Sequence, residues 1–440
     1  MLLRSVISWR CCSVRQFSRQ FSGGRLQRFE DIFDAACSAR EIPGVALLAY
    51  DKNSSLSYSK AFGMRSLQAP LNRERLDVDS TMYIASCTKL LTSVAAMQCV
   101  ERNLITLDED VRPILHELQD IDIINKVRGH SDEISMRKNA SPITLRQLLT
   151  HTSGFSYEFN EPVIQSWRRQ QPESLRRPPT SLRGRFLHPL VFEPGSSWSY
   201  GPSTDWAGVL VERLSGLNLQ DYMSQHIWKP LSITSMTFFL STRPDMQSRV
   251  AHMAWRRPND NPSEPPSTVV HAEMQPVLNP DMEDCLGGGG IFASPADYLK
   301  VLRALLLASD ASASDADPVP PAQLLRRSTV DAMLTPQLNE AGRKALQAIS
   351  EIPKLNLMMG GMPTTTPKDW GLAGLLVMDD LPLWRRRGTM TWGGTPNLTW
   401  WVDREAGLCG LYAGQLMPLG DEKSVEMTQL FEREMYAQQT

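Results

Sequence analysis

Apolar and polar positions alternate near both ends of the chain in the way that predicts β-strands. Six runs share this β-prone pattern: 44–50, 56–62, 371–378, 388–392, 397–402 and 408–413. The first two runs flank the polar turn 51–54, and the last two flank 403–407, which ends in glycine. Both patterns are typical of β-hairpins. We therefore expect antiparallel strands at the two ends of the chain.

The middle of the chain shows helical periodicity instead. Helices are predicted, from periodicity or a capping residue, at 86–102, 144–150, 203–214, 219–226 and 295–307, with a last one at 421–436. The pattern predicts an α/β fold of the α+β kind: an antiparallel sheet from both chain ends, flanked by helices, with a mostly helical region inserted. We expect one domain over 30–437, with its α/β part at about 30–85 and 285–437 and its helical part at about 86–284. Two stretches rich in Pro, Ser and Asp, 257–267 and 309–321, are expected to be surface loops.

Composition adds limits on class and compartment. Apolar residues make up 42% of the 440 residues and charged residues 21%, which is ordinary for a globular protein. No uncharged apolar run reaches the roughly 18 residues needed to span a bilayer, so we expect no membrane partner. The seven cysteines are odd in number, scattered and without metal-type spacing. They indicate reduced thiols inside a cell and neither a metal site nor a disulfide framework.

Residues 1–29 carry six of the 46 basic residues and none of the 48 acidic ones. Arginines interleaved with serines and apolar residues are typical of a mitochondrial transit peptide. A disordered tail or a misassigned start is the alternative, so the location is predicted as cytoplasmic or mitochondrial. The remainder of the chain is acidic, which gives no reason to expect nucleic-acid binding.

The segment Tyr83-Ile-Ala-Ser86-Cys-Thr-Lys89 places a serine at a predicted helix start and a lysine three residues later. Positions i and i+3 share one helical face, so the amine can reach the hydroxyl. A serine needs a neighbouring base to become a nucleophile. Burial lowers a lysine pKa by about 3–5 units when complete, and we expect such burial to leave Lys89 neutral. Alone the SxxK pattern is weak, because a serine at a helix start is usually a cap.

Further motifs follow in a fixed order along the chain. They are Leu148-Leu-Thr-His-Thr-Ser-Gly154, Phe192-Glu-Pro-Gly195, Tyr200-Gly-Pro202, Gly287 to Gly290, and Trp392-Gly-Gly-Thr395. In this order they make the chain resemble the serine β-lactamase and penicillin-binding-protein superfamily, on its class C and esterase side, over about residues 30–437. More closely, it is similar to fungal transesterases that acylate polyketides, of the lovastatin side-chain type.

The resemblance implies roles for the matching residues. Ser86 would form the acyl-enzyme, while Lys89 and Tyr200 would handle its proton, with the choice of base left open. The backbone N–H groups of Ser86 and Thr395 would form the oxyanion hole. Gly393 and Gly394 would let the substrate approach that strand edge.

Two departures from β-lactamases bear on the substrate. Trp392 stands where those enzymes carry a lysine, and Pro202 where they carry an asparagine. Both changes remove polar partners of a β-lactam, and a tryptophan wall suits a bulky apolar group. Tyr157 and Arg185 match positions of the acceptor pocket in the transesterases, although core packing of Tyr157 and a solvated Arg185 are equally open.

The resemblance predicts a monomeric, cofactor-free serine acyltransferase. It would move an acyl group from a thioester, either acyl-CoA or an acyl-carrier domain, to an alcohol of a secondary metabolite such as a polyketide. A carboxylesterase for small esters is the runner-up. A non-catalytic scaffold of the same fold is the third interpretation, and the intact Ser86, Lys89 and Tyr200 speak against it. Reversing the charge of an Arg-rich stretch that includes Arg168, Arg169, Arg176 and Arg177 would test for docking of an acidic carrier domain.

Overall fold

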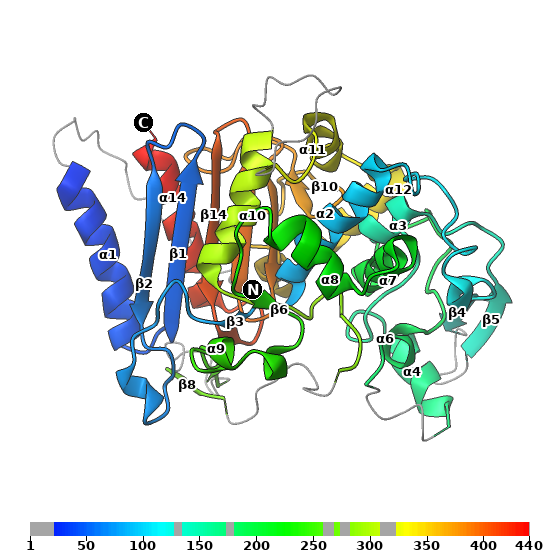
Figure 1. The fold of residues 1–440 in the computed structure, drawn as a ribbon, viewed down its shortest axis with the longest axis horizontal. Coiled ribbons are helices and arrows are strands. Elements are labelled where there is room, and N and C mark those ends of the chain that lie inside the picture. Colours follow the sequence, from blue (N-terminus) through cyan, green and yellow to red (C-terminus); the bar gives the residue numbers. More distant parts are fainter. Residues whose placement is uncertain are drawn as a thin grey trace, which may run out of the picture.

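A seven-stranded antiparallel sheet forms the centre of the computed structural model, which describes residues 22–126, 134–172, 180–257, 268–272, 282–308 and 323–439 (Figure 1). The strand order is β10-β11-β12-β13-β14-β1-β2. Their bounds are β1 Gly44–Asp51, β2 Ser57–Gly63, β10 Lys368–Trp370, β11 Leu375–Val377, β12 Met390–Gly394, β13 Leu398–Asp403 and β14 Leu408–Gly414. The sheet thus joins the two chain ends, and the predicted fold class is confirmed.

Strand β1 lies between β2 and β14 and is buried along its whole length. It pairs with β14 in a register that sets Val45 opposite Gly414 and Asp51 opposite Leu408. Alternate side chains point to opposite faces of a strand. Val45 and Leu47 therefore belong to a core with α1 (Ser22–Ser38) and α14 (Glu422–Gln438), while Leu48 belongs to a core with α2 (Thr88–Glu101) and α10 (Pro295–Ala308). Because both faces of β1 are covered, its sequence is a continuous apolar run without polar alternation.

Most of the remaining helices lie between β3 and β9 in the chain and form the part opposite α1 in Figure 1. Their bounds are α3 Leu145–Leu149, α4 Pro162–Gln170, α6 Leu182–Phe186, α7 Ser203–Ser215 and α8 Leu219–Met223, with a π-helical turn at Ser224–Trp228. Helix α9 (Pro244–Gln247) follows in the chain but lies below the sheet in Figure 1. Short 3₁₀ turns lie at Leu71–Arg73, Ala85–Cys87, His116–Leu118 and Leu240–Thr242. A capping box at Thr144 begins α3, as its sequence predicts. Helix α2 packs against α7 at the middle of this region.

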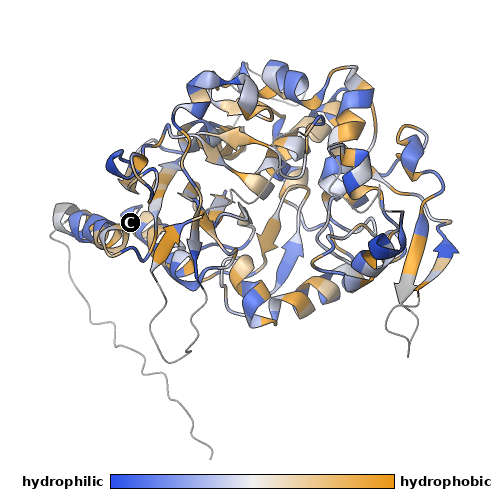
Figure 2. Cartoon of the chain, turned by 90° about the horizontal axis from the view of Figure 1, so that it is seen from below, coloured by the Kyte–Doolittle hydropathy of each residue, from blue (hydrophilic) through white to orange (hydrophobic). Residues whose placement is uncertain are grey.

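Three small sheets complete the structure. They consist of β3 (Met82–Tyr83) with β9 (Phe292–Ala293) and β6 (Met236–Thr237), of β15 (Leu416–Met417) with β7 (Ala254–Arg256) and β8 (Val269–His271), and of β4 (Asp122–Lys126) with β5 (Ile134–Lys138). Strand β3 leads straight into the turn that holds Ser86. The β4–β5 hairpin extends from the body of the molecule, as Figure 2 shows at its edge.

Several sequence predictions need correction. Helix α1 begins at Ser22 and buries Phe29 and Phe33, so the end of the 1–29 segment is helical and is not a disordered tail. Residues 1–21 lie outside the described residues, and the leader stays a prediction. The strand expected at 371–378 is restricted to 375–377, because Gly371 and Gly374 close a turn after β10. No element was predicted for α11 (Arg327–Met333), α12 (Glu340–Ser350) and α13 (Pro353–Met358). The loops expected at 258–267 and 309–321 lie outside the described residues.

A buried ion pair anchors α14 to the loop before β12. Arg385 and Glu432 have side chains that are 1% and 0% exposed, and two hydrogen bonds of 2.7 Å join them. The indole of Trp384 donates a further bond of 2.6 Å to Glu432. A buried charge that loses its partner is strongly unfavourable. The pair therefore makes the docking of α14 sensitive to the loss of either member.

We expect Glu432→Ala to lower the free energy of unfolding by about 3–5 kcal/mol, because Arg385 would stay buried without its counter-charge. Glu426→Ala is the matched control on the same helix. Glu426 is exposed and forms an ion pair with the partly exposed Lys423, so its loss should cost less than about 1 kcal/mol. Urea unfolding followed by circular dichroism measures both values, and equal losses would contradict the role given to the buried pair.

Candidate active site

Ser86 occupies a tight turn between β3 and α2. The turn, Ala85–Cys87, is 3₁₀-helical, and Ala85 has a φ of 45°, which an alanine rarely adopts. The Ile84 N–H bonds to Ile291 O of the neighbouring strand, and the Cys87 N–H bonds to Ile84 O. These bonds hold the turn in its strained shape. Such strain is concentrated at functional sites, where it aims a side chain.

The Lys89 ammonium contacts three oxygen atoms. Its Nζ donates to Ser86 Oγ at 3.3 Å, to the Tyr157 hydroxyl at 3.1 Å and to Gly288 O at 2.6 Å. The residue is 2% exposed, so these three acceptors replace water around the amine. An ammonium has three protons to donate, and each has a partner. The i and i+3 spacing therefore brings serine and lysine into contact, as predicted.

The pKa of Lys89 is shifted upward, which favours the charged amine and goes against the expectation of a neutral one. Burial lowers the pKa of Lys89, but Tyr157, Tyr200 and Asp205 raise it, and the net pKa lies above the ordinary lysine value. Burial is the largest single effect, but the three partners together outweigh it. A charged Lys89 can donate a hydrogen bond to Ser86 but cannot take its proton.

The ring of Tyr200 also lies close to the Lys89 amine. The Lys89 Nζ is 4.8 Å from the centroid of the Tyr200 ring, and the Trp392 indole N–H donates to the Tyr200 hydroxyl at 3.0 Å. The rings of Tyr200 and Trp392 are 4.9 Å apart. A donor aimed at the phenol oxygen supports negative charge on that oxygen. In this site the Trp392 indole is therefore a hydrogen-bond donor as well as an apolar wall.

His151 supports Tyr200 from behind. It is buried, its ring lies 4.8 Å from that of Tyr200, and its Nδ1 accepts the Gly201 N–H at 3.4 Å. Burial and the Lys89 charge hold the pKa of His151 well below its usual value, so the ring is neutral. Its φ of 58° marks a turn in the backbone. His151 thus acts as packing and as a backbone acceptor.

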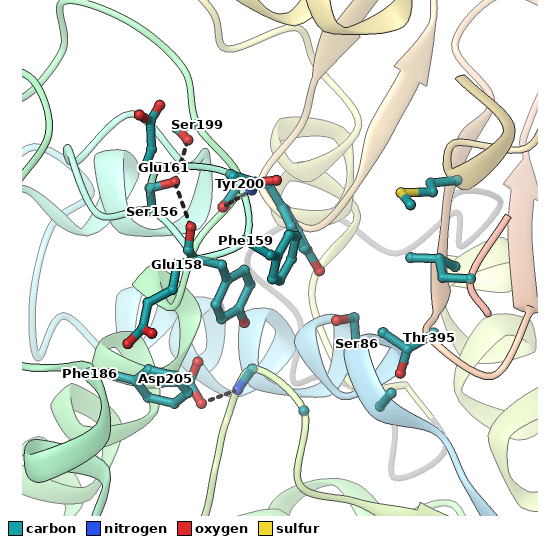
Figure 3. Close-up of a pocket in the computed structure, with 18 of the residues that line it drawn as sticks. Ser86, Ser156, Glu158, Phe159, Glu161, Phe186, Ser199, Tyr200, Asp205 and Thr395 are labelled. Carbon is teal, nitrogen blue, oxygen red and sulfur yellow. Dashed lines mark hydrogen bonds between the residues drawn. The ribbon is translucent and has the colours of Figure 1, made fainter. Parts of the chain in front are cut away.

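Strand β12 closes the other side of the turn. An added Cβ on Gly394 would lie 2.4 Å from Ile84 O, so only glycine lets the strand end this close to the Ser86 turn. Close packing with the nucleophile turn is thus a second reason for glycine here, beside substrate approach. In Figure 3, Ser86 lies between Tyr200 on one side and Thr395 on the other. The Thr395 hydroxyl oxygen is shielded from solvent and has no hydrogen-bond partner among the described residues.

A cavity of about 770 Å³ opens above Ser86. The predicted site residues that line it are Ser86, Tyr157, Arg185, Tyr200, Trp392, Gly393, Gly394 and Thr395, and Lys89 lies directly behind them. The residues that the sequence analysis selected therefore lie together around one cavity. Tyr157 was assigned to the acceptor pocket, but the structure also bonds it to Lys89. Of the Arg-rich stretch, Arg168 pairs with Glu158, whereas Arg176 and Arg177 lie outside the described residues.

Sequence reasoning missed two parts of the site. An apolar wall comes from α12, α13 and the residues next to them, and consists of Ile349, Ile352, Leu355, Met358 and Met359. No motif marks these residues, because their spacing in the sequence is the same as that of ordinary core residues. The second missed group is Asp205, which is buried in the first turn of α7 and bonds to the Gly288 N–H at 2.9 Å. The sequence feature that could have pointed to Asp205 is its position five residues after Tyr200.

The described residues form neither a metal cluster nor a membrane-spanning helix. Within those ranges, no group of three or more His, Cys, Asp or Glu side chains is placed to hold a metal ion. No helix in the described part of the chain is long and apolar enough to cross a bilayer. The described cysteines, Cys37, Cys87, Cys99, Cys285 and Cys409, are all free thiols.

Comparison with known proteins gives the same fold and a consistent set of relatives. The family model described as Beta-lactamase matches residues 29–430. Monacolin J acid methylbutanoyltransferase of Aspergillus terreus is 37% identical over 93% of this chain and 95% of its own length. Lovastatin esterase of Penicillium rubens is 35% identical over 92% and 96%. The unliganded structure of simvastatin synthase from Aspergillus terreus superposes with a TM-score of 0.83 at 35% identity, covering 94% of this chain and 98% of that one.

The close contact at Gly394 leads to a prediction about the nucleophile. We expect Gly394→Ala to push β12 away from the Ser86 turn and to slow labelling of Ser86 by a fluorophosphonate on the order of 100-fold, because small displacements of reacting groups have effects of this size. Gly342→Ala in α12 is the control, since its added Cβ meets ordinary contacts of 3.4 Å. Mass spectrometry follows the adduct, and wild-type labelling of Gly394→Ala would refute this account.

Proposed function

The chain belongs to the Beta-lactamase family, and from this we propose that it is a serine acyltransferase in which Ser86 carries the acyl group between a thioester donor and an alcohol acceptor. Its relatives at 34–37% identity include methylbutanoyltransferases of Aspergillus terreus and Penicillium citrinum. The observation that carries the proposal is the Lys89 ammonium, which bonds to Ser86 Oγ and lies against the Tyr200 ring at the base of a large cavity.

Tyr200 is the base in this proposal, because Lys89 already holds its proton. Tyr200, as phenolate, removes the Ser86 proton while Ser86 Oγ attacks the thioester carbonyl carbon. The Lys89 charge and the Trp392 N–H stabilise the Tyr200 oxygen before it takes the proton. When the tetrahedral intermediate collapses, the C–S bond breaks and the thiolate receives the proton from Tyr200. The products of this half-reaction are a free thiol and the acyl ester of Ser86.

The second half-reaction reverses these proton transfers with a new nucleophile. Tyr200 removes the proton of the acceptor alcohol, the alcohol oxygen attacks the Ser86 ester, and Ser86 leaves with the proton from Tyr200. In both halves the backbone N–H groups of Ser86 and Thr395 would bind the oxyanion, a contribution of about 3–4 kcal/mol for each donor. No cofactor takes part in any step.

The cavity favours bulky apolar substrates. Its walls include Trp392, Phe186 and the α12–α13 residues. Two arginines also line it, Arg185 and Arg168, and Arg168 is paired with Glu158. We propose a short acyl group and an alcohol acceptor of the polyketide class, with Tyr157 and Arg185 lining the acceptor part. The names of two relatives give a methylbutanoyl group as what those proteins transfer, with monacolin J acid in one name and ML-236A carboxylate in the other. A β-lactam lacks the polar partners that Trp392 and Pro202 have replaced.

The donor, compartment and assembly are further parts of the proposal. Either acyl-CoA or an acyl-carrier domain would bring the thioester to the cavity mouth. The protein would work as a monomer inside the cell, in the cytoplasm or in mitochondria, where its free thiols stay reduced.

Ester hydrolysis is the second candidate activity, because one relative of similar identity is a lovastatin esterase. The same acyl-enzyme serves both reactions, and they differ in whether water or an alcohol accepts the acyl group. An apolar cavity of about 770 Å³ disfavours water at the ester and so favours transfer.

Incubation with a short acyl thioester, with and without alcohols of different sizes, tests the function. We expect thiol release to depend on the alcohol and ester to exceed free acid. Free acid as the main product under all conditions would identify a hydrolase. Ser86→Ala should reduce turnover to the background rate, whereas Ser93→Ala, which changes a buried serine on the following helix α2, should retain it. Full activity of Ser86→Ala would reject the assignment.

The indole hydrogen bond gives a second kinetic prediction. Trp392→Phe keeps an aromatic wall but removes the N–H that stabilises charge on Tyr200, so kcat/KM should fall about 10-fold to 100-fold. Trp401→Phe on the neighbouring strand is the control, since the Trp401 N–H has no partner among the described residues. Equal rates for Trp392→Phe and the parent would show that the bond does not contribute.

A further inference from the structure

A buried carboxylate lies beside the catalytic lysine without a complete set of partners. Asp205 is 1% exposed and lines the cavity. Its Oδ1 accepts the Gly288 N–H at 2.9 Å, whereas its Oδ2 is shielded from solvent and has no hydrogen-bond partner among the described residues. A buried charge of this kind is unfavourable unless a nearby opposite charge compensates for it. Its position therefore needs a physical reason.

Gly288 connects this carboxylate to the lysine. Its N–H donates to Asp205 and its carbonyl accepts from Lys89 Nζ at 2.6 Å, so both backbone polar groups of one residue are occupied by the two charged side chains. An added Cβ on Gly288 would lie 2.2 Å from Asp205 Oδ2. The carboxylate thus packs directly against the glycine. Figure 3 shows the hydrogen bond of Asp205 at the edge of the pocket.

The groups that act on Lys89 come from several elements. Tyr157 and Tyr200 face it, and His151 is a neutral ring. Asp205 is the carboxylate among them, and it raises the pKa of Lys89. Two further groups interact electrostatically with Asp205: the Arg185 cation and the Tyr83 phenol. The Tyr83 hydroxyl donates to Gly289 O in the Gly287–Gly290 loop.

We propose that Asp205 is a positioning residue, whose negative charge keeps Lys89 protonated and whose bond to Gly288 fixes the Lys89 nitrogen between Ser86 and Tyr157. The proposal rests on the serine acyltransferase function. With the proton held on Lys89, Tyr200 takes the Ser86 proton, so Asp205 decides which of the two residues works as the base. It does this through Lys89 and Gly288 and contacts no reacting atom.

The direction of the pH effect follows from the charges. A lysine that must be protonated supports activity below its pKa and loses that role as the pH rises through it. Removing the nearby carboxylate lowers the pKa of Lys89, so the alkaline loss of activity moves to lower pH. Burial raises the pKa of Asp205 above its ordinary value, although Lys89, the Gly288 N–H and Arg185 act in the opposite direction. Protonation of Asp205 in acid removes its negative charge, so it lowers the pKa of Lys89 as an amide at position 205 would.

Asp205→Asn tests this on the full-length protein. The amide oxygen can still accept the Gly288 N–H, so the loop is retained while the charge is lost. The rate of Ser86 labelling by an uncharged fluorophosphonate, followed against pH by mass spectrometry, reports the reactivity of the serine. We expect the alkaline limb of this rate to lie about 1–3 pH units lower than in the parent. Circular dichroism and the melting temperature establish that the variant folds.

Asp297→Asn is the matched control. Asp297 also lies in the first turn of a helix, α10, is 5% exposed and accepts backbone N–H groups, from Thr234 at 2.9 Å and Ser235 at 2.6 Å. It does not line the cavity, so its neutralisation should leave the alkaline limb in place. A merely structural role of Asp205 would give both variants the same profile.

Each outcome decides the proposal. A parent-like alkaline limb in Asp205→Asn, or one moved to higher pH, overturns it. Should Asp205→Asn fail to fold, Asp205→Ala is labelled with and without formate, which can enter through the cavity. Restoration of the alkaline limb by formate supports the proposal, and an unchanged limb overturns it. A parent protein that takes no label at any pH would instead reject the serine acyltransferase function itself.

Discussion

The site depends on one interaction, the set of hydrogen bonds around the Lys89 ammonium. Its three acceptors come from separate regions of the chain: Ser86 from the turn before α2, Tyr157 from the loop after α3, and Gly288 from the turn before β9. A buried cation is tolerated only when its protons are bonded and its charge is balanced. The lysine therefore acts as a structural tie between these regions, and the same bonds orient it for catalysis.

This tie lies at the junction of the two parts of the molecule. The end of β12 reaches the Ser86 turn from the sheet, and α7 delivers Asp205 from the helical part, with Tyr200 just before it. Apolar packing has no preferred direction, whereas a hydrogen bond depends on distance and angle. Hydrogen bonds at the junction therefore restrict the distance between the two parts more closely than apolar packing alone would. The bonds that hold Lys89 in place thus also connect Tyr157 of the helical part with Gly288 of the part that contains the sheet.

The sequence predicted the parts of this arrangement that repeat or carry a motif. Alternation located the hairpins of the sheet, and the spacing of Ser86 and Lys89 placed both on one helical face. The charge of Lys89 was predicted wrongly, because burial can be read from a pattern but the surrounding acceptors cannot. Helix α1 was missed because the arginines near its start resemble a leader. The α12–α13 wall and Asp205 were missed because their partners lie far away in the chain.

The pairing of β1 with β14 has a consequence for synthesis. Val45 meets Gly414, so the first strand to leave the ribosome must wait for almost the last before both of its edges are paired. During that interval the hairpin of β1 and β2 exposes an apolar edge, which is the kind of surface that chaperones shield and that aggregates when crowded. A nascent chain released early would thus possess Ser86 and Lys89 and still have no completed sheet behind them.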